Sequence, residues 1–205
     1  MDTERYIVAI EIGSSKIRGA IATRSLKGVV TVLGVDTESL SGSVKRGFVV
    51  RPDEVSAKIR RLIVKLSNRI GTSKKIKQVY VGISGQSLHA EDHLISRDYP
   101  EGTLINEDII KHLQEEAREM PIAGADILEV VRTEVTVDDQ PRIGREELVG
   151  SSLKMGVKLI VARDELKKSA ARCFQGDLAV AHYIPTALST AYVALSNEER
   201  QAGVM

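Results

Sequence analysis

The chain has 205 residues, of which 42% are hydrophobic and 28% are charged, and its formal net charge is +1. A chain of this length can bury a core in one large domain or two small ones. The near-neutral charge, with five tyrosines, two phenylalanines and no tryptophan, argues against a basic, aromatic surface for nucleic acid.

The chain begins without the charged and then apolar pattern of a signal peptide, and no run approaches the ~20 apolar residues needed to span a bilayer. Its single cysteine, Cys173, excludes an intramolecular disulfide and is typical of a reducing compartment. In the segment LKKSAARCF, this cysteine is predicted to be a small buried helix residue and not a nucleophile. We therefore expect a soluble, cytoplasmic protein.

The N-terminal segment predicts a succession of short strands. Residues 5–12 and 16–23 are two apolar, alternating runs joined by a tight turn. Residues 28–36 are rich in β-branched side chains, and a shorter run follows at 47–50. Because the first three strands are joined by short turns, they are expected to form an antiparallel meander.

A helix and a buried strand follow this meander. Apolar residues recur at helical spacing between 55 and 70, and Gly71 supplies the stop. The segment VYVGISG (79–85) reads as a buried strand that ends in glycines. The resulting β-β-β-β-α-β order predicts an α/β fold.

The sequence changes character between residues 86 and 162. Polar, turn-rich residues precede a predicted helix at 107–120, for which Asn106 is a suitable N-cap. Strands are expected at 127–137 and 153–162, with a turn-rich loop between them. This pattern indicates a small α+β module inserted into the first domain.

The α/β pattern then returns. A helix is expected from Asp164 to Phe174, a strand over 178–184, and a helix that begins at Pro185 and continues to about Ser196. The final segment GVM (203–205) resembles the first residues of another strand.

Two familiar phosphate-binding patterns, Walker A and G-x-G-x-x-G, are absent from the sequence. The segment GISGQ (82–86) approaches the nucleophile elbow G-x-S-x-G but has Gln86 in place of the second glycine. Ser84 is therefore a poor candidate nucleophile.

The segment HAEDH places His89 and His93 four residues apart, with Glu91 between them. Its order differs from H-E-x-x-H, and the sequence offers no evident third ligand. A polar surface connection is predicted here instead of a metal site.

The turn after the first strand is the strongest candidate site. Its small residues Gly13, Ser14 and Ser15 would let successive backbone N–H groups approach an anion. Lys16 would add a positive charge, and Glu11 could hold a hydrated Mg²⁺. Taken alone, the pattern also fits an ordinary Gly-Ser hairpin without a ligand.

The segment AIEIGSSKIRGAIA resembles the first phosphate loop of the actin, Hsp70 and sugar-kinase superfamily, usually written D-x-G-S/T. With SVKRGFVVRPDEVSAKI, VYVGISG and YIPTALSTAYVAL, in matching order over essentially the whole chain, it is similar to the FtsA family. Members of that family are actin-like ATPases of bacterial cell division. The resemblance implies a partial α/β actin-like domain with an inserted SHS2-like module. Residues 1–85 and 163–205 would form part of subdomain 1A, and 86–162 would form subdomain 1C.

The resemblance also implies a function. Family members bind ATP and Mg²⁺, so Gly13, Ser14, Ser15 and Lys16 would approach the phosphates and Glu11 would position the metal. The protein would self-associate into filaments, help assemble the Z ring at the septum and anchor FtsZ to the inner membrane face. Residues 86–162 would serve self-assembly and the recruitment of later division proteins. No nucleic-acid partner is expected.

The sequence departs from this family in two respects. Glu11 stands where an aspartate is usual, and no second phosphate loop of the form D-x-G-x-G-T follows. The adenosine motif, the second domain that mainly contacts FtsZ, and the C-terminal membrane helix are not found either. We therefore expect an N-terminal fragment of a slow ATPase, itself inactive and weak in ATP binding. A pilus-assembly ATPase of the same superfamily, a sugar or acetate-type kinase, and a pure interaction module stay open as alternatives.

Overall fold

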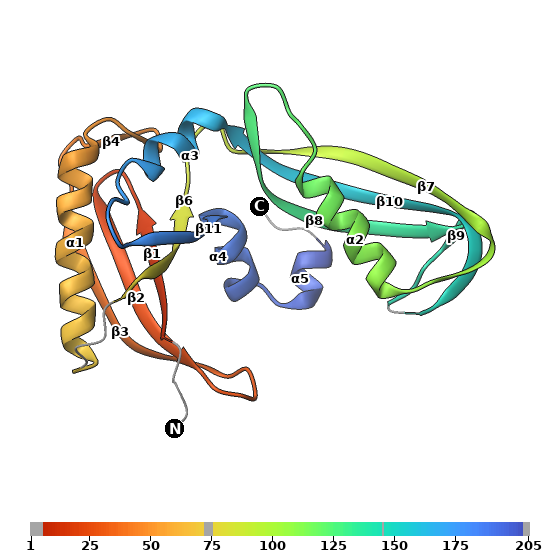
Figure 1. Ribbon diagram of the computed structural model, residues 1–205, viewed down its shortest axis with the longest axis horizontal. Coiled ribbons are helices and arrows are strands. Elements are labelled where there is room, and N and C mark those ends of the chain that lie inside the picture. Colours follow the sequence, from red (N-terminus) through yellow and green to blue (C-terminus); the bar gives the residue numbers. More distant parts are fainter. Residues whose placement is uncertain (1–5, 72–75, 145, 203–205) are drawn as a thin grey trace. The chain divides into compact units, whose positions relative to one another are not determined.

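The computed structural model describes residues 6–71, 76–144 and 146–202. The chain separates into two compact units. Unit 1 comprises Met1–Gln86 and Asp164–Met205, and unit 2 comprises Ser87–Arg163. Figure 1 shows the elements of both units, which are described separately below.

Unit 1 is built on a five-stranded sheet with the order β11-β6-β1-β2-β3. The strands are β1 (Tyr6–Ile12), β2 (Lys16–Arg24), β3 (Val30–Ser39), β6 (Gln78–Ile83) and β11 (Ala179–Pro185). The first three strands pair antiparallel, so the expected meander is confirmed. Strands β1, β6 and β11 are parallel to one another. Their carboxyl ends therefore meet at one edge of the sheet.

One face of this sheet is covered by helix α1 (Pro52–Arg69) (Figure 1). Alternate strand residues such as Val8, Ile10 and Ile17 are buried, as the two-residue period of a strand requires. The helix contributes a buried stripe of Val55, Ile59, Leu62 and Leu66. Burying one such side chain stabilises the fold by about 1.5–3 kcal/mol. The opposite face of the sheet carries both polar and apolar side chains, among them Glu11, Arg18 and Tyr80.

Helix α1 begins at Pro52, ahead of the apolar stripe between 55 and 70 from which the sequence predicted it. Pro52 occupies the first helical turn, where its missing N–H costs nothing and its fixed φ favours a helix. Asp53 and Glu54 lie in the same turn, at the positive end of the helix dipole. These start signals were visible in the sequence but precede the apolar stripe.

A small hairpin, β4 (Val44–Lys45) and β5 (Phe48–Val49), precedes α1. Its turn contains Gly47 with a φ of 90°. A Cβ on Gly47 would lie 2.1 Å from the carbonyl oxygen of Ser84, so only glycine allows this turn to pack against the loop after β6. The backbone N–H of Val49 donates to Ser169 Oγ of α3 (Asp164–Ala171) at 3.2 Å.

Cys173 lies two residues after the end of α3 at Ala171, so the prediction of a helix residue is wrong, but its side chain is buried as predicted. Burial, with a smaller contribution from Asp53, raises the pKa of the thiol to about 11. A thiol in this environment stays protonated at neutral pH, as expected for a structural residue.

The C-terminal part of unit 1 contains α4 (Thr186–Ala194) and the short α5 (Asn197–Ala202). The expected helix from Pro185 is confirmed in α4, although it ends before Ser196. Helix α5 was not expected. The strand expected at 203–205 lies outside the described residues.

Unit 2 is a four-stranded sheet with the order β7-β10-β8-β9 and one helix, α2. Its elements are β7 (His89–Ile105), α2 (Glu107–Arg118), β8 (Ala125–Val137), β9 (Gln140–Pro141) and β10 (Leu148–Arg163). The core consists of Ile105, Ile110, Leu113, Ala117, Val130, Val135, Val137, Leu153, Met155, Val157, Leu159 and Val161. Asn106 accepts hydrogen bonds from the N–H groups of Asp108 and Ile109, which confirms the predicted N-cap.

Strand β7 contradicts the prediction of a polar, turn-rich connection after residue 86. It pairs antiparallel with β10 from Leu148↔Ile105 to Val161↔His89. Many of its side chains are exposed, so its sequence lacks the apolar alternation that identifies a strand. Pairing with a distant segment, and not local propensity, makes this stretch a strand. For the same reason β10 begins five residues earlier than expected.

A partly buried ion cluster joins the start of α2 to β8 and to the segment after β9. Glu107 accepts hydrogen bonds from Arg132 at 2.9 Å and from Arg142 at 3.0 Å, and the Arg142 side chain is only 1% exposed. Burial alone would raise the pKa of Glu107, but the two guanidinium groups outweigh it and hold that pKa below its usual value. The carboxylate therefore stays charged and paired at neutral pH.

Candidate functional site

Three chain segments gather at the edge of unit 1 where the parallel strands end. The Gly13–Lys16 turn follows β1, the loop beginning at Ser84 follows β6, and α4 follows β11. In open α/β sheets, ligands bind in crevices outside the carboxyl ends of the strands. This edge is therefore the place to look for a site.

The Gly13–Lys16 turn is a closed hairpin. The N–H of Gly13 donates to the carbonyl of Lys16 at 3.0 Å, and the carbonyl of Ser15 accepts from Leu40 N–H at 2.8 Å. Within the described residues, the N–H groups of Ser14 and Ser15 donate to no protein acceptor. Ser14, Ser15 and Lys16 are exposed. Two adjacent free amides on a tight turn can bind an anion by donating hydrogen bonds to it.

Gly13 is required by the hairpin itself. A Cβ at this position would lie 3.0 Å from the carbonyl oxygen of Lys16, which is tighter than an ordinary contact between such atoms. Substitution of Gly13 would therefore disturb the turn as well as the approach of a ligand. For this reason Gly13 is a poor position at which to test binding alone.

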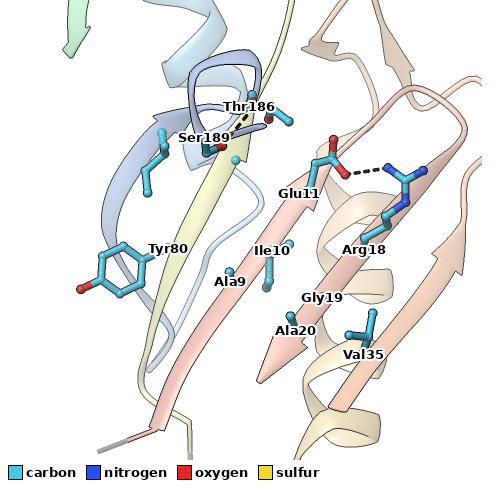
Figure 2. A pocket seen from close by; sticks show the side chains of 12 residues that line it. Ala9, Ile10, Glu11, Arg18, Gly19, Ala20, Val35, Tyr80, Thr186 and Ser189 are labelled. Atoms are coloured by element: carbon cyan, nitrogen blue, oxygen red, sulfur yellow. Dashed lines mark hydrogen bonds and ion pairs between the residues drawn. The ribbon is translucent and has the colours of Figure 1, made fainter. Parts of the chain in front are cut away.

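The charged residues beside the turn share one face of the sheet. Glu11 lies directly opposite Arg18 in the β1–β2 ladder, and Arg18 Nη1 donates to Glu11 Oε2 at 2.7 Å. Because side chains alternate along a strand, Lys16 projects from the same face as Arg18. Figure 2 shows the Glu11–Arg18 pair at the end of its two strands. Arg18 was not among the residues proposed from the sequence.

A pocket of about 380 Å³ opens on this same face, away from α1. Its floor is largely apolar and includes Ala9, Ala20 and Tyr80, while Glu11 and Arg18 line it near the turn (Figure 2). An apolar cavity with a few convergent polar groups is the usual form of a small-molecule site.

Gly82 keeps the pocket open between two of its polar groups. A Cβ on Gly82 would lie 3.1 Å from Thr186 Oγ1 and 3.7 Å from the Cβ of Glu11. The Thr186 hydroxyl is buried and has no hydrogen-bond partner within the described part of the chain. Ser189 Oγ, which donates to the carbonyl of Thr186 at 3.0 Å, lines the pocket beside it.

Sequence reasoning missed Gly82 and Thr186 as site residues. A signal for Gly82 was present, because a glycine inside a strand often marks the close approach of a ligand. Thr186 gave no signal of its own, since its position depends on β11 lying beside β6.

The residues at this edge fit a phosphate better than a metal ion. Free amides, a lysine and an arginine are typical phosphate ligands. The assignment of Glu11 to Mg²⁺ stays a prediction, and the ion pair with Arg18 argues against it.

The other sequence candidates do not form a site. Ser84 lies in the loop after β6, where its carbonyl faces Gly47. His89, Glu91 and His93 lie on strand β7, with Nε2 of His89 3.0 Å from Glu91. The Ser87 carbonyl and the Glu91 carboxylate raise the pKa of His89. This trio is a surface ion cluster on a strand.

No helix within the described residues has the length and apolar character needed to cross a membrane.

Comparison with known proteins gives a consistent set of relatives. Cell division protein FtsA of Porphyromonas gingivalis is 27% identical over 197 residues, which cover 95% of this chain and 41% of that protein. Cell division protein FtsA of Pseudomonas aeruginosa is 27% identical over 210 residues, which cover 98% of this chain and 48% of the relative. No protein-family model matches the chain.

A solved structure supports the fold. The PilM-PilN type IV pilus biogenesis complex contains a chain with a TM-score of 0.56 and 15% identity, covering 91% of this chain and 49% of its own. The predicted partial actin-like fold and the resemblance to FtsA are confirmed by these findings. The chain spans about half the length of the curated relatives it matches.

Proposed function

Because this chain is an actin-like protein similar to FtsA over nearly its whole length, we propose that it supplies one wall of the ATP site of a cell-division protein. The Gly13–Lys16 turn binds nucleotide phosphate. Arg18, Gly82 and Thr186 form the adjoining part of the wall. The observation that carries this proposal is the pair of free amides at Ser14 and Ser15, on a turn next to a pocket with an unpartnered hydroxyl.

Electrostatics support the assignment to a phosphate. Lys16 and Arg18 project from the same face of the strand after the turn. Of the described residues that line the pocket, Glu11 is the only carboxylate, and it is already paired. Hydrogen bonds between charged donors and phosphate are roughly twice as strong as neutral ones. An anion at this turn is therefore favoured over a cation.

The wider function follows from the relatives. The protein assembles through self-association, acts with FtsZ in the Z ring and lies on the inner face of the membrane at the division site. Unit 2 corresponds to subdomain 1C and serves self-assembly and the recruitment of later division proteins. The similarity to curated FtsA proteins over 95–99% of the chain supports division over pilus assembly. The pilus complex resembles this chain in fold alone.

The test compares ATP binding by the 205-residue chain and by the product of the whole gene. The longer protein is expected to bind ATP saturably in isothermal titration calorimetry. The chain alone is expected to show no saturation near about 1 mM ATP, because it lacks an opposed second phosphate loop. Each lost charge-assisted hydrogen bond costs about 1.5–3 kcal/mol, so a micromolar site of about −8 kcal/mol would not survive losing several.

Two results would contradict this account. If neither protein binds ATP, the nucleotide function is wrong. If the 205-residue chain alone binds ATP tightly, a complete site lies within it, and the proposed division of the site between two parts of the protein is wrong.

A further inference from the structure

The β1–β2 hairpin itself creates the Glu11–Arg18 pair. The turn closes through Gly13 and Lys16, and this register places residue 11 opposite residue 18. Residues of opposite charge that face each other across neighbouring strands attract one another and stabilise the pairing. The Glu11 carboxylate, 31% exposed, is therefore engaged by Arg18, 50% exposed, at 2.7 Å. The guanidinium occupies Oε2 of Glu11, and its positive charge disfavours a divalent ion at the neighbouring Oε1.

Arg18 also changes the charge of the phosphate end of the pocket. On this face, Glu11 carries one negative charge, and Lys16 and Arg18 each carry one positive charge, which leaves a net positive charge of one. Without the charge of Arg18, the net charge of these three positions would be zero. Nucleotide phosphates need cationic neutralisation, which a divalent ion usually provides. Here a resident side chain is placed to provide it.

We propose that Arg18 binds the nucleotide phosphate directly and takes the place of a divalent ion beside Glu11, so that ATP binding does not require Mg²⁺. A guanidinium has five N–H donors, and only Nη1 is used by Glu11. The remaining donors are free for phosphate oxygens, for which Arg has a suitable planar geometry. This inference rests on the proposed nucleotide site and identifies Arg18 as a residue of that site that binds phosphate.

The dimensions suit a polyphosphate. Arg18 lies two positions after Lys16 on the strand, with only Ile17 between them, which corresponds to about 7 Å. The long side chains of Lys16 and Arg18 can reach different phosphates of one nucleotide, while the Ser14 and Ser15 amides bind a phosphate at the turn. Glu11 holds the guanidinium in position and limits its rotamers.

The experiment measures ATP affinity by equilibrium dialysis with the product of the whole gene, in excess Mg²⁺ and in excess EDTA. In the wild type the two dissociation constants are expected to differ by less than about threefold. Arg18→Ala is expected to weaken binding in EDTA by about ten- to a hundredfold, the equivalent of one lost charge-assisted contact. Excess Mg²⁺ should restore part of this loss, because Glu11 is then free to hold a hydrated ion.

Three further variants make the interpretation specific. Arg18→Lys keeps the charge and should retain most of the binding in EDTA. Glu11→Gln tests the metal directly: its ATP affinity should be the same in Mg²⁺ and in EDTA, as in the wild type, whereas a metal-ligand role for Glu11 predicts a loss of affinity in Mg²⁺ alone. Arg24→Ala removes an exposed arginine at the far end of the same strand and should have no effect. Arg18 and Glu11 are partly exposed, so loss of their pair costs little stability.

The outcomes separate this inference from the proposed function. Wild-type binding in Mg²⁺ but not in EDTA would overturn the role of Arg18 and leave the nucleotide site standing. Unchanged EDTA binding by Arg18→Ala would overturn it as well. No wild-type binding in either buffer would overturn the nucleotide site itself, and this inference with it.

Discussion

Replacing Gly47 with valine is expected to destabilise unit 1 by about 4 kcal/mol, more than most single substitutions. The residue has a φ of 90°, which is strained for a β-branched side chain. Its Cβ would also lie 2.1 Å from the carbonyl oxygen of Ser84 and 2.6 Å from the Cα of Gly85. Both neighbours are backbone atoms, so the clash can be relieved only by moving the loop after β6.

Gly71→Val is the matched control. Gly71 also has a positive φ, 58°, but a Cβ there would meet nothing within 4 Å. Its substitution should cost only the conformational strain, about 1–2 kcal/mol. Urea unfolding, followed by hydrogen exchange of amides in β1 and β6, reports the stability of unit 1 itself. Equal destabilisation by both variants would show that the contact between Gly47 and Ser84 contributes nothing.

Replacing Gly82 with leucine is expected to weaken ATP binding by the whole gene product by at least about a thousandfold, which corresponds to roughly 4 kcal/mol. The new side chain would project between Glu11 and Thr186, where a Cβ alone already lies 3.1 Å from Thr186 Oγ1. Gly82 is partly exposed on the pocket side of the sheet. The leucine can therefore occupy the pocket without entering the core under α1.

Gln78→Leu places the same side chain on the same strand and face, at the exposed start of β6, outside the pocket lining. It should leave ATP affinity unchanged. Both variants should unfold at about the same urea concentration as the wild type. This midpoint can be measured on the same protein samples that are used for calorimetry. Wild-type affinity in Gly82→Leu would mean that the nucleotide does not use this pocket.

The sequence predicted the sheet of unit 1 well because local patterns decide it. The alternation in residues 6–24, the tight turn at Gly13 and the helical stripe ending near Gly71 each carry their own signal. Strand β7 carried no such signal, because its long pairing with β10 involves residues 43 or more positions away. A polar strand of this kind becomes visible only when its partner is known.

The candidate site was predicted in part. The turn could be found from its small residues, and its Gly13–Lys16 closure is observed. Arg18 could have been found too, since a hairpin closed at residues 13 and 16 places residue 11 opposite residue 18. Thr186 could not, because it reaches the pocket only through the parallel pairing of β11 with β6.

The central claim is that the free amides of the Gly13–Lys16 turn bind nucleotide phosphate. It is tested most directly by following backbone amide resonances of the whole gene product during titration with ATP. The account predicts saturable shifts that are largest at Ser14 and Ser15, with smaller shifts at Gly82 and Thr186 and none at Gly102 and Gly124 of unit 2. Saturable ATP binding that leaves the Ser14 and Ser15 amides unmoved would contradict it.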